Sequence, residues 1–463
     1  MTPSTHGARR AQLAQRLRCD GIDIAVVPTA PERQRNADSD HPYRHDSHFH
    51  YLTGFDEPQA WLVLRSDGHS TLFCRTGNPE REAWNGHRLG IEAAPGALGV
   101  DTALPIDSLG EQLPQMLANR QAVGFPFGRY PELQAQVEGW LATVRARERN
   151  GIECPTRLHD LHPLIAEMRL FKDADELATM RRAAALSAGA HLRVMRYCAR
   201  RFREGAASVR EYELEAELLH EFRRHGAQSP AYPSIVAAGA NACVLHHPAG
   251  TAELRPDELC LVDAGCELDG YASDITRTFP ASGRFSAPQR ELYEVVLAAQ
   301  QAAIEDTRPG RRQRDAHHAA VRVLTRGMLD LGLLSRDRHG NEEDIVASAA
   351  YRQFYMHGTG HWLGRDVHDV GEYLSLDEVP IEQPDGYGGT VVKLPSRMLR
   401  PGMVVTVEPG LYVRPAARVP ERYWNLGIRI EDDAVVTDSA TGCELISRDV
   451  PVDPIEIEAW MRD

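Results

Sequence analysis

The sequence predicts a protein of two domains, a smaller α/β domain over residues 1–165 and a larger α+β domain over residues 170–463. Helix and strand patterns alternate through the first ~150 residues, which is typical of an α/β domain. A linker around residues 151–176 follows, and the rest of the chain combines long helices with several short strands. A length of 463 residues is enough for two or three domains.

The elements of the first domain are predicted from local patterns. Leu13 and Leu17 fall on one face of a helix near the N-terminus. Residues 22–31 (IDIAVVPTAP) form the apolar run of a buried strand. Two β-rich runs flank Asp67 and Gly68, and an Asp-Gly pair between such runs is a strong signal for a hairpin turn.

The second domain begins with a well-marked helix. Asp173 as N-cap and Glu176 three residues later make a capping box, which predicts a helix running to about Arg200. A further helix is expected over residues 288–306, where the sequence RPG follows it.

Between these two helices, Ser208 and Glu211 repeat the spacing of a capping box. We therefore expect another helix to start there and to stop at Gly226. Its apolar face consists of Leu214, Leu218 and Phe222.

Composition excludes several classes of function. The formal net charge is −14 and the sequence pI is about 5.8, so the chain has no basic stripe of the kind that nucleic-acid or anionic-membrane binding requires. The N-terminus lacks the apolar core of a signal peptide, and no run approaches the ~18 apolar residues of a membrane span. The eight cysteines are dispersed without a C-x-x-C pair, which indicates reduced thiols. We expect a cytoplasmic protein.

Residues 357–369 (HGTGHWLGRDVHD) place three histidines and two aspartates among glycines. The glycine spacing resembles a dinucleotide-binding loop, but its last interval is one residue too long and a histidine stands where a pyrophosphate would approach. Histidine is the commonest metal ligand and a proton-transfer group near pH 7, so the cluster favours a chemical site. A polar loop with hydrogen-bonded histidines is the alternative.

Four acidic residues lie on or at the end of predicted strands: Asp263, Asp274, Glu408 and Glu431. A carboxylate at the end of a buried strand is costly unless it is hydrogen-bonded, paired or bound to a metal. For each residue alone, a salt bridge or a strand-end turn is the simpler explanation. Together with one histidine from residues 357–369, they form a ligand set suited to Mn²⁺, Co²⁺, Fe²⁺ or Zn²⁺.

Two ions balance four carboxylates better than one ion does. Carboxylates that bridge ions ~3.5–4 Å apart would hold a shared hydroxide, because paired cations lower the pKa of bound water towards neutrality.

The sequence resembles the Xaa-Pro aminopeptidases (aminopeptidase P) of the metallopeptidase family that includes prolidase and methionine aminopeptidase. The matching segments, in family order, are VDAGCELDGYASDITRTFP, HGTGHWLGRDVHD, GMVVTVEPGLYV and GIRIEDD. SIVAAGANACVLHH and RNADSDHPYRHDSHFHYLTGFDEP also match, so the likeness spans nearly the whole chain. The resemblance implies a pita-bread catalytic domain behind a smaller creatinase-type N-terminal domain.

The resemblance also implies roles for individual residues. The metal ligands would be Asp263, Asp274, His361, Glu408 and Glu431, with Asp274 and Glu431 bridging two ions, most simply Mn²⁺.

The substrate-binding residues would be His246, His357, His368, Arg429 and Trp84. His357 and His368 would stabilise the oxyanion, and Glu408 would pass a proton to the proline nitrogen. Arg429 would orient a ligand carboxylate, and its alternative is a surface arginine paired with Asp432. The family tryptophan that Trp84 matches reaches a neighbouring subunit in tetramers, and its alternative is local packing.

The implied activity is hydrolysis of the N-terminal Xaa-Pro bond of peptides, by a homo-oligomer that is a dimer or a tetramer. Prolidase, which cleaves only dipeptides with the same metal set, is the alternative enzyme. Creatinase and non-catalytic pita-bread binding modules lack the ligand set that is present here. One departure from the family is residues 374–395, which form a longer connection that we expect to cover the site and to affect the preferred substrate length.

Overall fold

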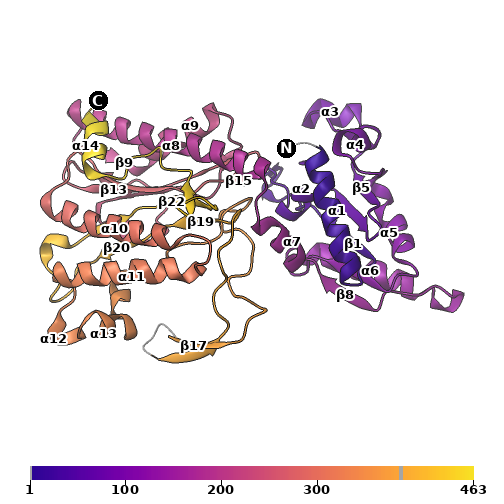
Figure 1. Cartoon of the computed structure of the whole chain (residues 1–463). Helices are drawn as coiled ribbons and strands as arrows, with labels where there is room; N and C mark the ends of the chain where they lie inside the picture. The colour runs from indigo at the N-terminus through magenta and orange to yellow at the C-terminus, as the bar shows by residue number, and fades with distance from the viewer. Residues whose placement is uncertain (1–2, 385–388, 463) are drawn as a thin grey trace. The chain divides into compact units, whose positions relative to one another are not determined.

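The computed structural model describes residues 3–384 and 389–462, and the chain divides into two compact units, Met1–Arg169 and Leu170–Asp463 (Figure 1). None of the helices in these described stretches is long and apolar enough to cross a membrane. All eight cysteines lie in the described part of the chain and are free thiols.

The first unit is built on a mixed six-stranded sheet with the order β6-β5-β4-β1-β7-β8. Its central strand β1 (Ile24–Pro28) pairs antiparallel with β4 (Trp61–Arg65) and parallel with β7 (Ala122–Phe125). The other strands are β5 (Ser70–Cys74), β6 (Thr102–Pro105) and β8 (Arg157–Asp160). The helices are α1 (Pro3–Cys19), α2 (Ser47–Thr53), α3 (Pro79–Asn85), α4 (Gly90–Leu98), α5 (Leu109–Leu117), α6 (Pro131–Arg145) and α7 (His162–Leu170).

Both faces of this sheet are buried, which explains why residues 22–31 are a nearly continuous apolar run. Ala25 and Val27 pack into one hydrophobic cluster, together with the α1 residues Leu13 and Leu17, while Ile24 and Val26 pack into another on the opposite face. The predicted hairpin joins β4 and β5, and Gly68 adopts a φ of +100° in its turn. The α/β prediction for this part of the chain is confirmed.

In the second unit, short strands lie between two layers of long helices. Figure 1 shows α8 (Ala174–Arg203) and α9 (Glu211–Arg224) on one side of the strands, and α10 (Ala287–Asp306) and α11 (Gln313–Asp330) on the other. The three-stranded sheets are β11-β13-β16 and β19-β22-β23, and β20 pairs with β21. Their bounds are β11 (Ile235–Ala238), β13 (Leu259–Asp263), β16 (Thr276–Pro280), β19 (Val404–Val407), β20 (Gly410–Val413), β21 (Leu426–Arg429), β22 (Asp432–Val436) and β23 (Cys443–Leu445).

The remaining elements of this unit are short: β9 (Val209–Arg210), β10 (Ser229–Pro230), β12 (Glu253–Leu254), β14 (Cys266–Leu268), β15 (Tyr271–Ala272), α12 (Arg336–His339), α13 (Glu342–Ala347) and α14 (Pro454–Arg462). Residues 374–395 contain a hairpin of β17 (Ile381–Pro384) and β18 (Thr390–Lys393), and residues 385–388 of that stretch lie outside the described residues.

Two of the three helix predictions are confirmed, and the start of the third helix is wrong. The Asp173 carboxylate accepts from the Glu176 N–H at 2.9 Å, and the Glu176 carboxylate accepts from the Asp173 N–H at 3.0 Å. α10 begins one residue before the expected range. Ser208, however, does not cap α9, because Val209 and Arg210 are held extended by antiparallel pairing with β12 and the helix starts only at Glu211.

Candidate metal centre

The acidic residues of the predicted site converge from three neighbouring strand ends. Asp263 is the last residue of β13, Glu408 directly follows β19, and Glu431 lies between β21 and β22. Asp274 lies in the connection between β15 and β16, so the expectation that a strand carries it is wrong. Its backbone N–H donates to the Asp433 carboxylate at 3.1 Å, which holds this connection against β22.

Asp274, His361 and Glu431 form the centre of the site, because each offers a ligand atom within 4.8 Å of the others. His361 Nε2 lies 3.4 Å from Asp274 Oδ2 and 3.7 Å from Glu408 Oε1. Asp263 is joined to the group by Tyr232, whose hydroxyl lies 2.6 Å from Asp263 Oδ1 and also contacts Asp274 Oδ1. The structure therefore brings all five predicted ligands together.

Gly360 allows His361 to enter this group. The backbone of His361 runs beside β19, where its N–H donates to Thr406 Oγ1 at 3.1 Å and its carbonyl accepts from the Thr406 N–H at 3.0 Å. A Cβ atom at Gly360 would lie 2.0 Å from the Thr406 carbonyl oxygen. Only glycine lets the two backbones approach this closely.

The four carboxyl groups lie close together in a buried region, where the charged form is disfavoured. Burial raises the pKa of Glu408 to about 7 against the influence of His361 and Arg429, and it raises the pKa of Asp274. The pKa of Glu431 is also well above its ordinary value, because of burial and then the charges of Asp274 and Glu408. Burial disfavours charge on His361, but Asp274 and Glu408 outweigh it and raise that pKa to about 9.

These shifts agree with a site for cations. Four carboxylates that repel one another in a region of low polarity are stabilised by bound metal ions, which reverse the local pKa pattern. Carboxylate oxygens with one imidazole nitrogen are a donor set for hard or borderline divalent ions. The residues present therefore fit the metal ions that the sequence predicts.

Arg429 is buried beside the acidic group, with a residue exposure of 3%. Its guanidinium donates to Asp263 Oδ2 at 2.6 Å, to the Tyr412 hydroxyl at 3.0 Å and to Thr276 Oγ1 at 3.2 Å. The alternative of a surface arginine paired with Asp432 is wrong, because Asp432 pairs with the guanidinium of the buried Arg277 at 2.8 Å. Arg429 thus contacts a carboxylate of the predicted site.

The three other histidines of the prediction surround the same place. His357 Nε2 lies 2.8 Å from the Tyr412 hydroxyl, and burial lowers the pKa of His357 to about 3 with help from Arg429. The His368 ring is 4.2 Å from the His361 ring, centroid to centroid. His246 is exposed and lies near enough to His357 and His368 to contribute to the lowering of both their pKa values.

The sequence matches metallopeptidase family M24 over residues 178–438 and the N-terminal domain of aminopeptidase P over residues 6–124. The chain belongs to metallopeptidase family M24. The Xaa-Pro aminopeptidase of Escherichia coli is 44% identical over 441 residues, which cover 94% of this chain and 93% of that protein.

Solved structures give the same result for the fold. The structure of Pseudomonas aeruginosa aminopeptidase PepP, which is 44% identical, matches with a TM-score of 0.90 over 100% of this chain and 98% of that chain. A zinc-substituted E. coli aminopeptidase P in complex with product, 41% identical, also matches with a TM-score of 0.90 over 100% of this chain and 98% of that one. The pita-bread catalytic domain and the creatinase-type N-terminal domain of this family member are thus confirmed.

Trp84 belongs to the first unit, where it lies in α3 with 86% of its surface exposed. This exposure rules out the alternative of a locally packed tryptophan. A contact with a neighbouring subunit stays a prediction.

Sequence reasoning missed the tyrosines that connect the site. Tyr232 joins two carboxylates, and Tyr412 joins His357 to Arg429. Tyr412 could have been found, because it lies four residues after Glu408 in the segment GMVVTVEPGLYV and alternate residues of β20 share one face. For Tyr232 the sequence offers no comparable signal, because its partners lie 31 and 42 residues away.

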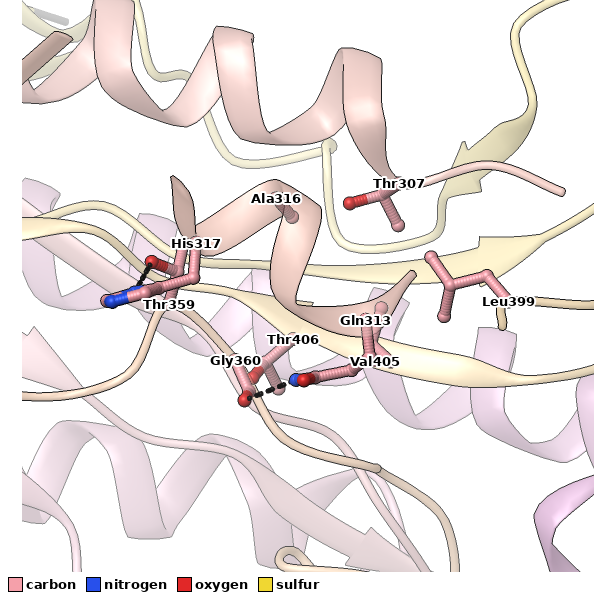
Figure 2. Close-up of a pocket in the computed structure, with 9 residues that line it drawn as sticks. All are labelled: Thr307, Gln313, Ala316, His317, Thr359, Gly360, Leu399, Val405 and Thr406. Atoms are coloured by element: carbon pink, nitrogen blue, oxygen red, sulfur yellow. Dashed lines mark hydrogen bonds between the residues drawn. The ribbon is translucent and has the colours of Figure 1, made fainter. Parts of the chain in front are cut away.

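A small cavity lies behind the segment that carries His361 (Figure 2). Its volume of about 20 Å³ is enough for one water molecule. Figure 2 shows His317 paired with the Thr359 hydroxyl, at 2.8 Å, and Gln313 donating to the Gly360 carbonyl, at 3.2 Å. In this family member, α11 therefore holds the two residues that directly precede His361.

Proposed function

We propose that this chain is an Xaa-Pro aminopeptidase, which releases the first residue of peptides that have proline in second position. The observation that carries the proposal is the convergence of four carboxylates and His361, in a chain 44% identical to the Xaa-Pro aminopeptidase of E. coli over nearly its whole length. Because relatives so similar along the whole chain carry that name, aminopeptidase activity is favoured over the prolidase alternative.

We assign two divalent ions to this group, which Asp263, Asp274, His361, Glu408 and Glu431 would hold. When bound, the ions would supply hydroxide near neutral pH and polarise the scissile carbonyl. Mn²⁺ is our first choice, with Co²⁺, Fe²⁺ and Zn²⁺ as alternatives. The zinc-substituted E. coli structure shows that one relative accepts zinc.

The chain's own residues then have separate tasks. His357 is neutral at pH 7, because its pKa is near 3, so its imidazole is a hydrogen-bond donor or acceptor and carries no charge. Its Nδ1 donates to the Gly358 carbonyl at 2.6 Å, so its Nε2 accepts from the Tyr412 hydroxyl at 2.8 Å, and these two contacts fix the ring beside the acidic group. Glu408 is assigned to take a proton, return it and deliver it to the proline nitrogen.

His246 and His368 are exposed around the acidic group and are assigned to substrate binding. Arg429 is assigned an indirect role, because its guanidinium donates to Asp263, Tyr412 and Thr276. It fixes the Asp263 carboxylate in position. A cytoplasmic location and assembly into a dimer or tetramer, with Trp84 reaching a neighbouring subunit, remain predictions.

The test is reconstitution of metal-stripped protein with Mn²⁺, Co²⁺ or Zn²⁺, followed by assays on Xaa-Pro dipeptides and on Arg-Pro-Pro. We expect cleavage of the tripeptide after the first residue, with the highest rate in Mn²⁺. Cleavage restricted to dipeptides would establish prolidase activity instead. Full activity in protein shown to be free of transition metals would overturn the metal assignment.

A further inference from the structure

Glu211, the first residue of α9, is fully buried, and its carboxylate collects hydrogen bonds from one segment of the chain. The backbone N–H groups of Ala238 and Gly250 donate to it at 2.9 and 3.0 Å. The Asn241 side-chain amide donates at 2.9 Å, and His247 Nε2 lies 2.9 and 3.0 Å from its two oxygens. All four partners fall within residues 238–250, which we name the His246 segment.

The His246 segment lies against strands of the metal centre. A Cβ atom at Gly427, in β21, would lie 2.3 Å from the Ala242 carbonyl oxygen, so the two backbones touch. Arg414, which follows β20, donates to the Cys243 carbonyl at 2.6 Å. The backbone between Asn241 and Gly250 contains the exposed His246 directly before the partner of Glu211, His247.

Glu211 binds this segment as a charged group. Burial alone would raise its pKa, but the donors Ala238, Asn241 and His247 outweigh burial and bring the pKa below its ordinary value. Hydrogen bonds to an ionised carboxylate are about twice as strong as neutral ones. A single buried side chain thus fixes the segment near its start, in its middle and at its end.

We propose that Glu211 is a positioning residue for substrate binding, which fixes the His246 segment and thereby the place of His246 at the substrate site. The proposal rests on the proposed function, because it assigns to His246 a contact with the substrate. Glu211 itself is buried beneath the segment and acts through it. Loss of its carboxylate therefore weakens substrate binding and leaves the metal ligands in place.

The primary variant is Glu211→Gln. Glutamine keeps the size of the side chain, but its NH₂ group faces N–H donors of the His246 segment and cannot accept from them. We expect KM for Arg-Pro-Pro to rise about tenfold, equivalent to about 1.4 kcal/mol, with kcat within about twofold of the unchanged protein. The dissociation constant for Mn²⁺ should not change. Hydrogen exchange of residues 239–250 should become faster in the variant.

The matched control is Glu217→Gln on the same helix, where the carboxylate pairs with Arg193 and not with the His246 segment. This variant should keep the KM and the exchange rates of the unchanged protein. If Glu211→Gln does not fold, His247→Asn is used, because it keeps the carboxylate and its three N–H donors and removes only one partner. We expect a smaller rise in KM for that variant.

A double-mutant cycle separates a positioning role from a general structural one. In a His246→Ala background, Glu211→Gln or His247→Asn should cause no further rise in KM, although it should still lower the melting temperature. An equal rise in KM in both backgrounds, or a fall in kcat with KM unchanged, would overturn the proposal. So would a normal KM for His246→Ala alone, whereas failure of the unchanged protein to cleave Arg-Pro-Pro would overturn the proposed function.

Discussion

Replacement of Glu408 by glutamine tests the electrostatics of the metal centre directly. In the metal-free protein, the pKa of Glu408 is raised from 4.5 to about 7, and burial is the largest cause. Each pKa unit is worth about 1.4 kcal/mol, so ionisation of this group costs the folded state about 3 kcal/mol. The sign follows from linkage: the folded form binds the proton more tightly, so this contribution to stability is intact below pH ~4.5 and is lost as the pH rises through ~7.

The assay is urea unfolding of chelator-treated protein at pH 5 and pH 8, for the original chain and for Glu408→Gln. Between these pH values, we expect the original chain to lose about 2–3 kcal/mol more than the variant does. Adding Mn²⁺ at pH 8 should restore stability to the original chain and much less to the variant. Turnover by the variant should fall by about 10²–10⁴, the usual contribution of general acid–base catalysis, with further loss from the missing ligand.

The matched control is Glu444→Gln, because Glu444 is a surface carboxylate paired with Arg181 at 2.6 Å. It should change neither the pH dependence of stability nor turnover. The same pH dependence in the original chain and in Glu408→Gln would show that Glu408 is ionised at no cost. That result would refute the inference that burial among other carboxyl groups disfavours the charged form of Glu408.

Three further changes have defined outcomes. His361→Ala should abolish turnover and at least one equivalent of bound metal while the far-UV circular dichroism is retained, and a variant that holds two equivalents, as measured by elemental analysis, would contradict the ligand assignment. Replacing residues 376–394 by an Asn-Gly turn should leave the fold and dipeptide cleavage intact, because the Ser375 N–H donates to the Pro395 carbonyl at 2.9 Å and a two-residue turn can connect such a pair. The ratio of rates on long and short peptides should change, and an unchanged ratio would show that this stretch has no part in length preference. Lys172→Met should destabilise the protein by about 3–5 kcal/mol in urea unfolding, since it removes the ammonium group that lies 3.0 Å from the carboxylate of the buried Asp369, and a loss below ~1 kcal/mol would contradict the buried-pair interpretation.

The sequence predicted those features whose interacting residues lie close together in the chain. Asp173 with Glu176, and Asp67 with Gly68, are signals complete within a few residues, and the structure forms the elements that they indicate. The α/β and α+β assignments rest on many such local patterns, and the resemblance to a family added the pita-bread topology.

Predictions were wrong where a partner remote in the chain determined the local structure. Ser208 and Glu211 have the spacing of a capping box, but β12 holds the residues between them extended, and Glu211 bonds to residues 238–250 instead. Asp274 was expected on a strand because its neighbours are β-prone, but the strand is interrupted around it. The positions of Tyr232 and Tyr412 depend on packing between strands, which sequence periodicity does not contain.

The position of Tyr232 has a consequence for how the protein acquires its ions. Its hydroxyl has one hydrogen and lies against two carboxylate oxygens, so it donates to only one of them at a time. In the metal-free protein, carboxyl groups with raised pKa values keep protons, and metal ions displace these protons when they bind. Metal binding therefore releases protons, which titration calorimetry in buffers of different ionisation enthalpy should record. Mild acidification should release the metal ions before the enzyme unfolds.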